Sequence, residues 1–398
     1  ILYRLAVWTP SPRKAEKESL DNMFAITEDL KILVMNIEAL STKKGTSFAQ
    51  RFLNAHTAMM AIDESTTIKN HGAKRSKNAV TVGVKAKFRR ILTGSPVTRS
   101  PLDLFQQCAF LSYACLNQAS FYGFQNRYAV VIERRLASHS FKQVVGYQRL
   151  DELSGKLNAF SFRIRKEECL DLPEKIYVKR EVDLTDEQRR AYNQMRTMAL
   201  AQFNEGMTTT VNALTQIMRL HQIVCGHIKL DDGTVKELPN LRIQEMLDTI
   251  EESDGKVIIW ASYRHDIEAI RLTLQKAYGM SAVASYYGDT PDDERQEVIT
   301  RFQDPKSDLR FFVGNPRTGG YGITLTEAKL VIYYSNSFDL EVRLQSEDRA
   351  HRIGQKNNVT YVDLLCPGTV DEKIVQALRD KIDIAGRVLK EEVKAWLI

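Results

Sequence analysis

Three polar side chains near the carboxyl end of the chain have the types and spacing to bind a polyphosphate. Gln345, Arg349 and Arg352 are separated by four and by three positions, so a helix would carry all three on one face. A guanidinium offers a rigid fork of N–H donors and keeps its charge near neutral pH. The spacing therefore predicts two arginines aimed at phosphate oxygens, although a solvated helix end with mixed charges would show the same pattern.

Two adjacent carboxylates, Asp63 and Glu64, follow an apolar segment at residues 58–62 that is predicted to be a strand. At a strand end, the first carboxylate can hold the Mg²⁺ of a nucleotide, and the second can orient or deprotonate the attacking water. Strand ends often carry acids, so the pair has meaning only beside other phosphate-binding residues. A nuclease or a polymerase would also use paired acids to bind metals, but no further acids cluster around this pair in the sequence.

Two short turns contain glycines and hydroxyls that allow a backbone to approach a phosphate. Gly320, Gly322 and Thr324 lie in the segment 317–326, where glycine leaves room for a ligand and the hydroxyl can donate a hydrogen bond. A glycine-rich turn alone is a weak signal, and it gains weight only from its position in the chain. The second turn follows a predicted strand and contains Thr93, Gly94 and Ser95.

A basic segment precedes the second turn. Residues 69–90 contain no acidic residue, and the net charge of the whole chain is +6. Such a segment is either a solvated helix face or a surface that follows a nucleic-acid backbone, and the sequence leaves both readings open. Its basic residues are Lys69, Lys74, Arg75, Lys77, Lys85, Lys87, Arg89 and Arg90.

Together these segments resemble the motifs of the Swi/Snf-related DNA-dependent ATPases of helicase superfamily two. The run from Gln345 to Gln355 is similar to the family pattern Q-x-x-x-R-x-H-R-x-G-Q, and residues 63–70 are similar to D-E-A-H-x-I-K-N. Residues 91–97 resemble L-T-G-T-P, and residues 317–326 resemble R-A-G-G-x-G-I-N-L-T. The motifs also follow one another in the same order as in that family. Within the family, the chain is most similar to the compact fork-remodelling and annealing branch, or to a bacterial or phage type.

The resemblance implies a role for each of these polar residues. Asp63 would hold the Mg²⁺ that accompanies ATP, and Glu64 would activate water, while Gln345, Arg349 and Arg352 would complete the catalytic set. The resemblance further implies that Gly320, Gly322 and Thr324 bind ATP together with Asp63, Arg349 and Arg352. It implies that Thr93, Gly94 and Ser95 couple hydrolysis to movement. The residues that it implies contact the backbone of duplex or forked DNA are Lys69, Lys74, Arg75, Lys77, Arg317 and Thr318.

The chain departs from the family pattern in two respects. Family members carry Ala and His where this chain has Ser65 and Thr66, so the coupling role of that His is not carried over to Thr66. No G-x-x-x-x-G-K-[ST] sequence, the loop whose amides and lysine cradle phosphates, occurs in the chain. We therefore expect an N-terminally truncated motor that hydrolyses ATP negligibly by itself and exposes a strand edge. A non-catalytic DNA-binding remnant and a partner-completed half of a split helicase are the alternatives.

Apolar strand-like segments alternate with helical patterns, which predicts an α/β fold. The resemblance implies two RecA-like, doubly wound parallel-sheet lobes, of which the first is incomplete, with a helical insertion between them. The expected boundaries are 1–105 for the partial first lobe, 106–235 for the insertion and connector, 236–368 for the second lobe and 369–398 for a brace helix. The apolar segment at 30–35 is expected to be a strand covered on both faces. Further strands are expected at 2–8, 256–260 and 359–365, and amphipathic helices are expected near 184–205, with Thr185 as its cap, and near 207–224.

Composition limits the remaining possibilities. The fractions of hydrophobic and charged residues, 43% and 27%, are those of a globular protein, and no apolar run approaches the roughly 18 residues needed to span a bilayer. The five cysteines form no C-x-x-C pair, which is typical of a reducing compartment. His221, Cys225 and His227 have no obvious fourth ligand, so structural zinc is not expected. We expect a monomeric intracellular protein without a membrane partner, cytoplasmic in a bacterial or phage-infected cell.

Overall fold

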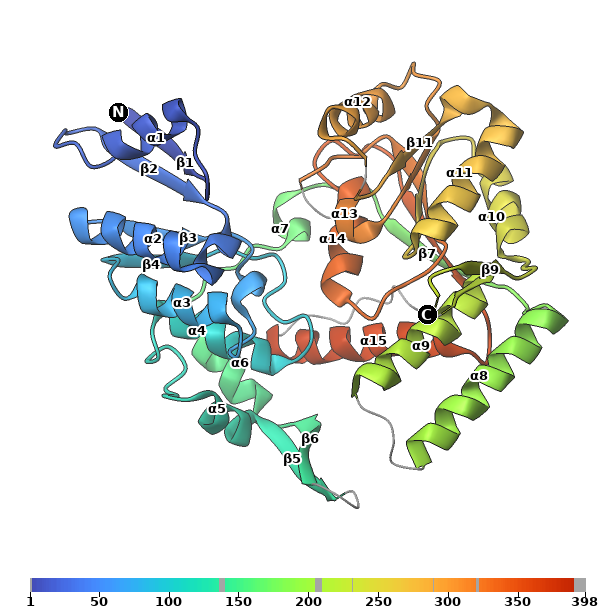
Figure 1. Ribbon diagram of the computed structural model, residues 1–398, viewed down its shortest axis with the longest axis horizontal. Coiled ribbons are helices and arrows are strands. Elements are labelled where there is room, and N and C mark those ends of the chain that lie inside the picture. The colour runs from blue at the N-terminus through green and yellow to red at the C-terminus, as the bar shows by residue number, and fades with distance from the viewer. Residues whose placement is uncertain are drawn as a thin grey trace. The chain divides into compact units, whose positions relative to one another are not determined.

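The structure of the chain is a computed structural model that describes residues 2–135, 140–204, 210–230, 232–288, 290–319 and 322–389. The described residues form two compact units, shown in Figure 1 and treated separately below. The first unit contains residues 2–135, 140–162 and 384–389, and the second contains the described residues from 163 to 383. No helix in these ranges is long and apolar enough to cross a membrane. The finer boundaries expected at 105, 235 and 368 stay predictions.

Two pairs of parallel strands form the centre of the first unit. β1 (Tyr3–Trp8) pairs with β2 (Leu30–Met35), and β3 (Met59–Ile62) pairs with β4 (Phe88–Ile91). The apolar segments predicted to be strands near residues 2–8, 30–35 and 58–62 are thus confirmed. Amphipathic helices cover one side of the strands: α1 (Lys14–Asn22), α2 (Lys43–Ala55), α3 (Lys74–Gly83) and α4 (Leu104–Leu111).

The other side of these strands is apolar but is not covered by the described residues. Side chains alternate between the two sides of a strand, so Ala6 and Trp8 are buried under the helices while Leu5 and Val7 are 52% and 54% exposed. The expectation that the strand at 30–35 is covered on both faces is therefore wrong for one face. We call this exposed side the bare face. Its large apolar residues are Tyr3, Leu5, Val7, Leu30, Ile32, Val34, Met59 and Phe88.

A helical cluster completes the first unit. Phe124, Tyr128 and Leu153 are fully buried in it, together with Val388 near the end of helix α15 (Val370–Leu389). The sequence predicted this part of the chain to be mostly helical and did not reveal its antiparallel hairpin, β5 paired with β6. The elements of the cluster are α5 (Phe121–Tyr128), β5 (Ala129–Arg135), β6 (Ser140–Tyr147) and α6 (Leu150–Asn158).

The second unit is built on a six-stranded sheet in which every neighbouring pair of strands is parallel. The strand order is β11–β12–β10–β13–β14–β7, so the edge strand β7 comes from the segment that precedes the rest of the sheet in the chain. The strands are β7 (Lys175–Glu181), β10 (Lys256–Trp260), β11 (Val283–Tyr286), β12 (Phe311–Gly314), β13 (Ala328–Tyr333) and β14 (Val359–Leu365).

Helices cover both faces of this sheet. Val257 and Ile259 of β10 pack on the side of α10 (Arg242–Glu251), α11 (Arg264–Tyr278) and α15, whereas Ile258 and Trp260 pack on the side of α12 (Asp292–Gln303) and α14 (Leu340–Ala350). All four of these β10 residues are completely buried. The doubly wound parallel sheet that the sequence predicted is thus confirmed in this unit.

Two long helices and several short elements connect the sheet strands. α8 (Asp186–Asn204) and α9 (Thr210–Cys225) confirm the two amphipathic helices predicted in this region, and the Thr185 hydroxyl accepts a hydrogen bond from the Gln188 amide at 3.3 Å as the predicted cap. The short elements are α7 (Lys166–Cys169), α13 (Pro316–Gly319), β8 (His227–Lys229), β9 (Val235–Glu237) and the 3-10 helices η1 (Ile37–Ser41), η2 (Ser65–Ile68), η3 (Pro101–Asp103) and η4 (Met280–Ala282).

Candidate functional site

The carboxylate pair lies at the carboxyl end of β3 in the first unit. Asp63 is exposed, and its Oδ1 accepts a hydrogen bond of 3.0 Å from the Glu64 amide. Glu64 has φ 48° and ψ 59°, a left-handed conformation that costs a residue with a side chain about 1 kcal/mol. Strained backbone of this kind gathers at functional sites. The turn thus presents two adjacent carboxylates at a strand end, in a conformation that the residue type itself disfavours.

Ser65 joins this turn to the neighbouring strand and helix. Its amide donates to the carbonyl of Leu92, just beyond β4, at 3.0 Å, and its buried hydroxyl donates to Oε1 of Gln107 at 2.7 Å. Gln107 lies on α4 and donates in turn to the carbonyl of Pro96 at 2.9 Å. A chain of hydrogen bonds therefore connects the carboxylate turn with the segment 93–96.

The predicted coupling residues lie at one end of this chain of hydrogen bonds. Asp103 is buried, and its carboxylate accepts hydrogen bonds from the Arg99 amide at 2.7 Å and from the Thr98 amide at 3.1 Å. The loop after β4 is thus fixed by Gln107 and Asp103, two side chains that the sequence did not single out. The coupling residues follow β4 directly and are Thr93, Gly94 and Ser95, with the Ser95 amide donating to the Thr93 hydroxyl at 3.1 Å.

Two of the residues predicted to contact DNA make contacts inside the first unit. Lys69 Nζ donates to the hydroxyl of Thr98 at 2.7 Å. Arg75 donates to the carbonyl of Thr67 at 2.8 Å and forms an ion pair with Glu38. Both cations therefore help to position the carboxylate turn and the loop after β4.

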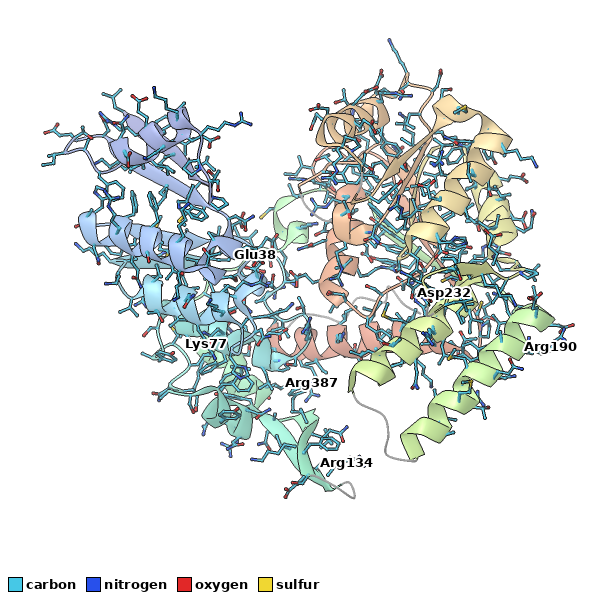
Figure 2. The ribbon with its side chains drawn as sticks, viewed as in Figure 1. Glu38, Lys77, Arg134, Arg190, Asp232 and Arg387 are labelled. Carbon is cyan, nitrogen blue, oxygen red and sulfur yellow. The ribbon has the colours of Figure 1, made fainter. Side chains whose placement is uncertain are left out.

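The other predicted DNA contacts are more exposed. Lys74 and Lys77 extend into solvent from α3 of the first unit, and Figure 2 labels Lys77. Arg317 and Thr318 lie on α13 of the second unit, where Arg317 is exposed and pairs with Asp339 at 3.3 Å. These positions present positive charge to solvent in each of the two units.

The segment 345–355, which we call the arginine run, lies in the second unit, directly beside the glycine-rich turn at 317–326. Arg349 Nη1 donates to the Ile323 carbonyl at 3.3 Å, and Arg352 Nη1 donates to the Thr324 hydroxyl at 3.2 Å. The Leu325 amide donates to the Arg349 carbonyl at 2.9 Å. Two segments that are separate in the sequence, the arginine run and the glycine-rich turn, are thus in contact. Both guanidiniums lie close to the part of the turn that contains Thr324.

The prediction that the three polar side chains share one helical face is wrong for Arg352. α14 ends at Ala350, so Arg352 lies beyond the helix while the other two remain in it. Tertiary contacts impose this end, because the Gln355 side chain donates to the carbonyls of Ala328 and Ala350 at 3.1 Å each. The chain turns within this run at Gly354, whose φ of 101° suits glycine.

Of the two glycines predicted to approach a phosphate, Gly322 is described and Gly320 lies outside the described residues. Gly322 has φ 73°, a backbone conformation that a residue with a side chain rarely adopts. Apart from its chain neighbours, no atom of the described residues would lie within 4 Å of a Cβ at this position. The glycine is therefore suited to the backbone conformation of the turn, and its surroundings leave space beside it.

A buried ion-pair network underlies α14, and the sequence analysis missed it. Arg343 is only 3% exposed, and its guanidinium donates to Asp363 at 3.0 Å and to Glu347 at 2.9 Å. Lys175 and Tyr177 of β7 donate to the other oxygen of Glu347 at 2.9 Å and 2.8 Å. The network ties the helix that carries the arginine run to strands β7 and β14.

Acid should destabilise the second unit through Glu347. Burial alone would raise the pKa of this carboxyl, but Lys175 and Arg343 outweigh burial and lower the pKa from 4.5 to about 2. The unfolded chain therefore binds this proton at a higher pH than the folded chain does. The stability that the carboxylate contributes is complete above about pH 4.5 and is lost as the pH falls toward 2. Urea unfolding measured across this pH range should show the loss as a falling free energy of unfolding. Glu347→Gln should make the free energy of unfolding less dependent on pH. An unchanged pH dependence in the variant would contradict the role given to Glu347.

The cluster of His221, Cys225 and His227 belongs to the interior of the second unit. His221 Nε2 lies 3.3 Å from Asp371 Oδ1, and His227 Nδ1 lies 2.9 Å from Asp266 Oδ1. Cys225 is buried, and burial raises the pKa of its thiol well above the usual range. Among the residues that the structure describes, no three His, Cys, Asp or Glu side chains are grouped to hold a metal. The two histidines pair with aspartates instead, and Cys225 packs in the hydrophobic core.

Each unit therefore presents a different set of charged groups. The first unit offers carboxylates at a strand end, which suit a divalent cation. The second offers guanidiniums beside a glycine-rich turn, which suit anionic phosphate oxygens. Comparison with known proteins gives these groups a family context.

Residues 7–229 match the SNF2-related domain, and residues 240–354 match the helicase conserved C-terminal domain. The first match alone covers more than half of the chain. This chain therefore belongs to the SNF2-related family, and the predicted resemblance is confirmed. The predicted fold class, two RecA-like α/β lobes, is confirmed by this membership together with the parallel strands of both units.

Curated relatives agree with this assignment. A mouse SWI/SNF-related regulator of chromatin, subfamily A member 1, is 28% identical over 85% of this chain and 32% of its own length. An uncharacterized ATP-dependent helicase of Mycoplasma genitalium is 27% identical over 84% of this chain and 31% of its own length. The chain thus spans about one third of the relatives it matches. A solved Sulfolobus solfataricus SWI2/SNF2 ATPase core in complex with double-stranded DNA has 24% identity and a TM-score of 0.43, over 98% of this chain and 82% of that one.

Proposed function

We propose that this chain is the motor portion of an ATP-dependent DNA translocase that uses residues of both units to hydrolyse ATP. The observation that carries the proposal is the direct contact of Arg349 and Arg352 with the glycine-rich turn of the second unit, in a chain whose first unit holds Asp63 and Glu64 at a strand end. Family membership supports ATP as the nucleotide.

The acidic turn would serve the metal and the water. Asp63 is exposed at the end of β3 and is suited to hold the Mg²⁺ of ATP, which when bound offsets the negative charge of the phosphates. Glu64 would orient the attacking water and accept its proton. The strained conformation of Glu64 fixes its backbone beside Asp63, so the two carboxylates keep separate tasks.

The arginine run would serve the phosphates. One donor of Arg349 contacts the Ile323 carbonyl, and one donor of Arg352 contacts the Thr324 hydroxyl. Anionic phosphate oxygens would be stronger acceptors for the same donors. Gln345 and the turn with Gly320, Gly322 and Thr324 would complete this side of the nucleotide site.

Movement would be coupled to hydrolysis through the network in the first unit. Ser65, next to Glu64, reaches Pro96 through Gln107, so a displacement of the carboxylate turn is transmitted to the loop after β4. The coupling segment, Thr93, Gly94 and Ser95, begins that loop. Lys69 and Arg75 would support the loop and the turn, while Lys74, Lys77, Arg317 and Thr318 would contact the DNA backbone.

Replacing both exposed lysines of α3 should make DNA binding less dependent on salt. Each phosphate contact adds about 0.9 to the slope of log affinity against log salt concentration. We therefore expect Lys74→Ala with Lys77→Ala to reduce the slope by roughly two, measured with labelled duplex DNA from about 50 to 200 mM salt. Lys236→Ala, which removes an exposed lysine of β9 in the second unit, is the matched control. If the double variant and the control had the same dependence of affinity on salt, Lys74 and Lys77 would not contact the DNA backbone.

The missing phosphate-binding loop limits what the 398 residues do by themselves. We expect the isolated chain to show negligible ATP turnover with or without DNA, because no backbone cradle or lysine holds the β- and γ-phosphates. Robust DNA-stimulated turnover by the isolated chain would refute this part of the proposal. The alternatives are a non-catalytic DNA-binding remnant and a partner-completed half of a split helicase.

A further inference from the structure

Three aromatic rings lie together in the first unit, beside the lysines of α3. The ring of His71, which precedes α3, stacks on the ring of Phe121 at the start of α5, with centroids 3.5 Å apart and planes 9° apart. The ring of Tyr122 stands almost perpendicular to both, 6.3 Å from His71 and 5.8 Å from Phe121. We call these three rings the aromatic surface. Two segments that are distant in the sequence build it together.

Local hydrogen bonds and the hydrophobic core hold two of these rings in place. Asn70 Oδ1 accepts a hydrogen bond of 2.9 Å from the Gly72 amide, which fixes the turn that contains His71. Phe121 packs against the buried ring of Phe105 at 5.8 Å. The aromatic surface is therefore ordered before any ligand arrives, and a ligand that binds to it loses little free energy in ordering side chains.

Tyr122 is the ring that this arrangement presents to solvent. Its side chain is 70% exposed, whereas Phe121 is partly buried against the core of the helical cluster. Neighbouring residues of a helix point in directions about 100° apart, so one ring anchors while the next faces outward. Single exposed aromatic residues are ordinary in soluble proteins. Tyr122 differs from them because two further rings support it and because of the charge beside it.

The charge near the aromatic surface indicates the kind of ligand. Lys74 and Lys77 are exposed on α3, and the segment 69–90 contains no acidic residue. Burial and the positive charge of Lys77 both lower the pKa of His71, so its ring is neutral near neutral pH and stacks as an uncharged aromatic group. Aromatic rings next to cations suit a ligand that combines flat rings with negative charges, and a nucleic-acid strand has both.

Only an unpaired base can stack on such a ring. In a duplex the faces of each base are covered by the neighbouring bases, so a protein reaches them only when the base has left the stack. Phosphates are accessible in duplex and single-stranded DNA alike. Lysines alone would therefore bind both forms, whereas the aromatic surface adds a contact that a duplex does not offer.

We propose that Tyr122 stacks on an unpaired base of a DNA strand. The stacked rings of His71 and Phe121 hold Tyr122 in position. The neighbouring lysines of α3 contact phosphates of the same strand. This inference rests on the proposed function for DNA being the ligand, and it goes beyond that function by assigning a site for single-stranded DNA to a residue that following a duplex backbone does not require.

The affinity of the 398-residue chain for three labelled probes tests the proposal. The probes are a single-stranded thymidine oligonucleotide, an abasic strand with the same number of phosphates, and a blunt duplex. Tyr122→Ala should weaken binding of the thymidine oligonucleotide about 10-fold, as expected for the loss of one stacked base, and leave the other two affinities unchanged. Tyr122→Phe keeps the ring and should bind normally. The salt dependence should stay the same in both variants, because stacking neutralises no phosphate.

Photocrosslinking tests the position of the base directly. A single strand that contains 5-iododeoxyuridine should crosslink to Tyr122, and mass spectrometry of the digested complex would identify the peptide. Lys74→Ala with Lys77→Ala should lower the yield without changing the crosslinked residue, because these lysines hold the phosphates and not the base. Crosslinks only at residues outside the aromatic surface would overturn the proposal.

A matched control and the remaining outcomes make the binding test decisive. Tyr3→Ala removes a tyrosine of β1 in the same unit that is 64% exposed, and it should leave all three affinities unchanged. If Tyr122→Ala weakened binding of all three probes equally, the residue would have a structural role and the proposal would be wrong. An unchanged affinity for the thymidine oligonucleotide would also overturn it, while duplex binding would still support the proposed function. Failure of the unaltered chain to bind any probe would count against both.

Discussion

Replacing Arg343 with leucine should lower the free energy of unfolding of the second unit by about 3–5 kcal/mol. Arg343 is the only guanidinium between Asp363 and Glu347 in the described network, and all three side chains are almost completely buried. Leucine would leave the two buried carboxylates with less charge compensation. Urea unfolding followed by circular dichroism would measure the loss.

The arginine run itself contains the matched control for this experiment. Arg352→Leu changes the same residue type nine positions later, but Arg352 is exposed and its guanidinium donates to the hydroxyl of Thr324 rather than to a buried carboxylate. Its removal should change the free energy of unfolding by less than about 1 kcal/mol. If both variants lost the same free energy of unfolding, burial of Arg343 would not determine how much Arg343 contributes to stability.

The second large effect is expected on catalysis. Arg352, whose replacement should have the smaller effect on stability, should be the arginine whose replacement lowers ATP turnover. In the chain combined with a phosphate-binding loop segment, Arg352→Ala should lower kcat for ATP by about 10³-fold or more, the range seen when an arginine that stabilises a transferring phosphoryl group is removed. Because this interaction strengthens in the transition state, the KM for ATP should change far less than kcat. Steady-state ATP hydrolysis with saturating DNA would measure both.

Two further variants make this result specific. Arg301→Ala removes a partly exposed arginine of α12 and should leave turnover unchanged. Arg352→Lys keeps the charge but loses the forked donors, so it should recover only part of the activity. If Arg352→Ala raised KM with an unchanged kcat, the residue would contribute to nucleotide binding and not to the chemical step.

Several strands of this protein could be predicted closely because they are short apolar runs bounded by polar residues. β2 and β14 begin and end where the sequence placed them, and β10 does so as well. The bare face could not be predicted in the same way. An apolar run such as residues 30–35 has the same sequence whether its second side is covered by its own chain or by another molecule.

The roles assigned to the site residues stay predictions, whereas the structure gives an arrangement that the sequence did not predict. The family resemblance identified Arg349 and Arg352, yet the helix ends at Ala350 because of contacts that Gln355 makes with a distant strand. The network around Arg343 was hidden for a similar reason. Its partners on β7 and β14 are far away in the sequence, and only the four-residue spacing of Arg343 and Glu347 indicated a pair.

The edge position of β7 also has a consequence for synthesis on the ribosome. Among the described strands, β7 pairs only with β14, through partners such as Lys175 with Val359. At translation rates of about 5–20 residues per second, β14 follows β7 by roughly 10–40 s. During that time β7 has no partner strand, and this edge of the sheet in the second unit can form only after β14 has been synthesised.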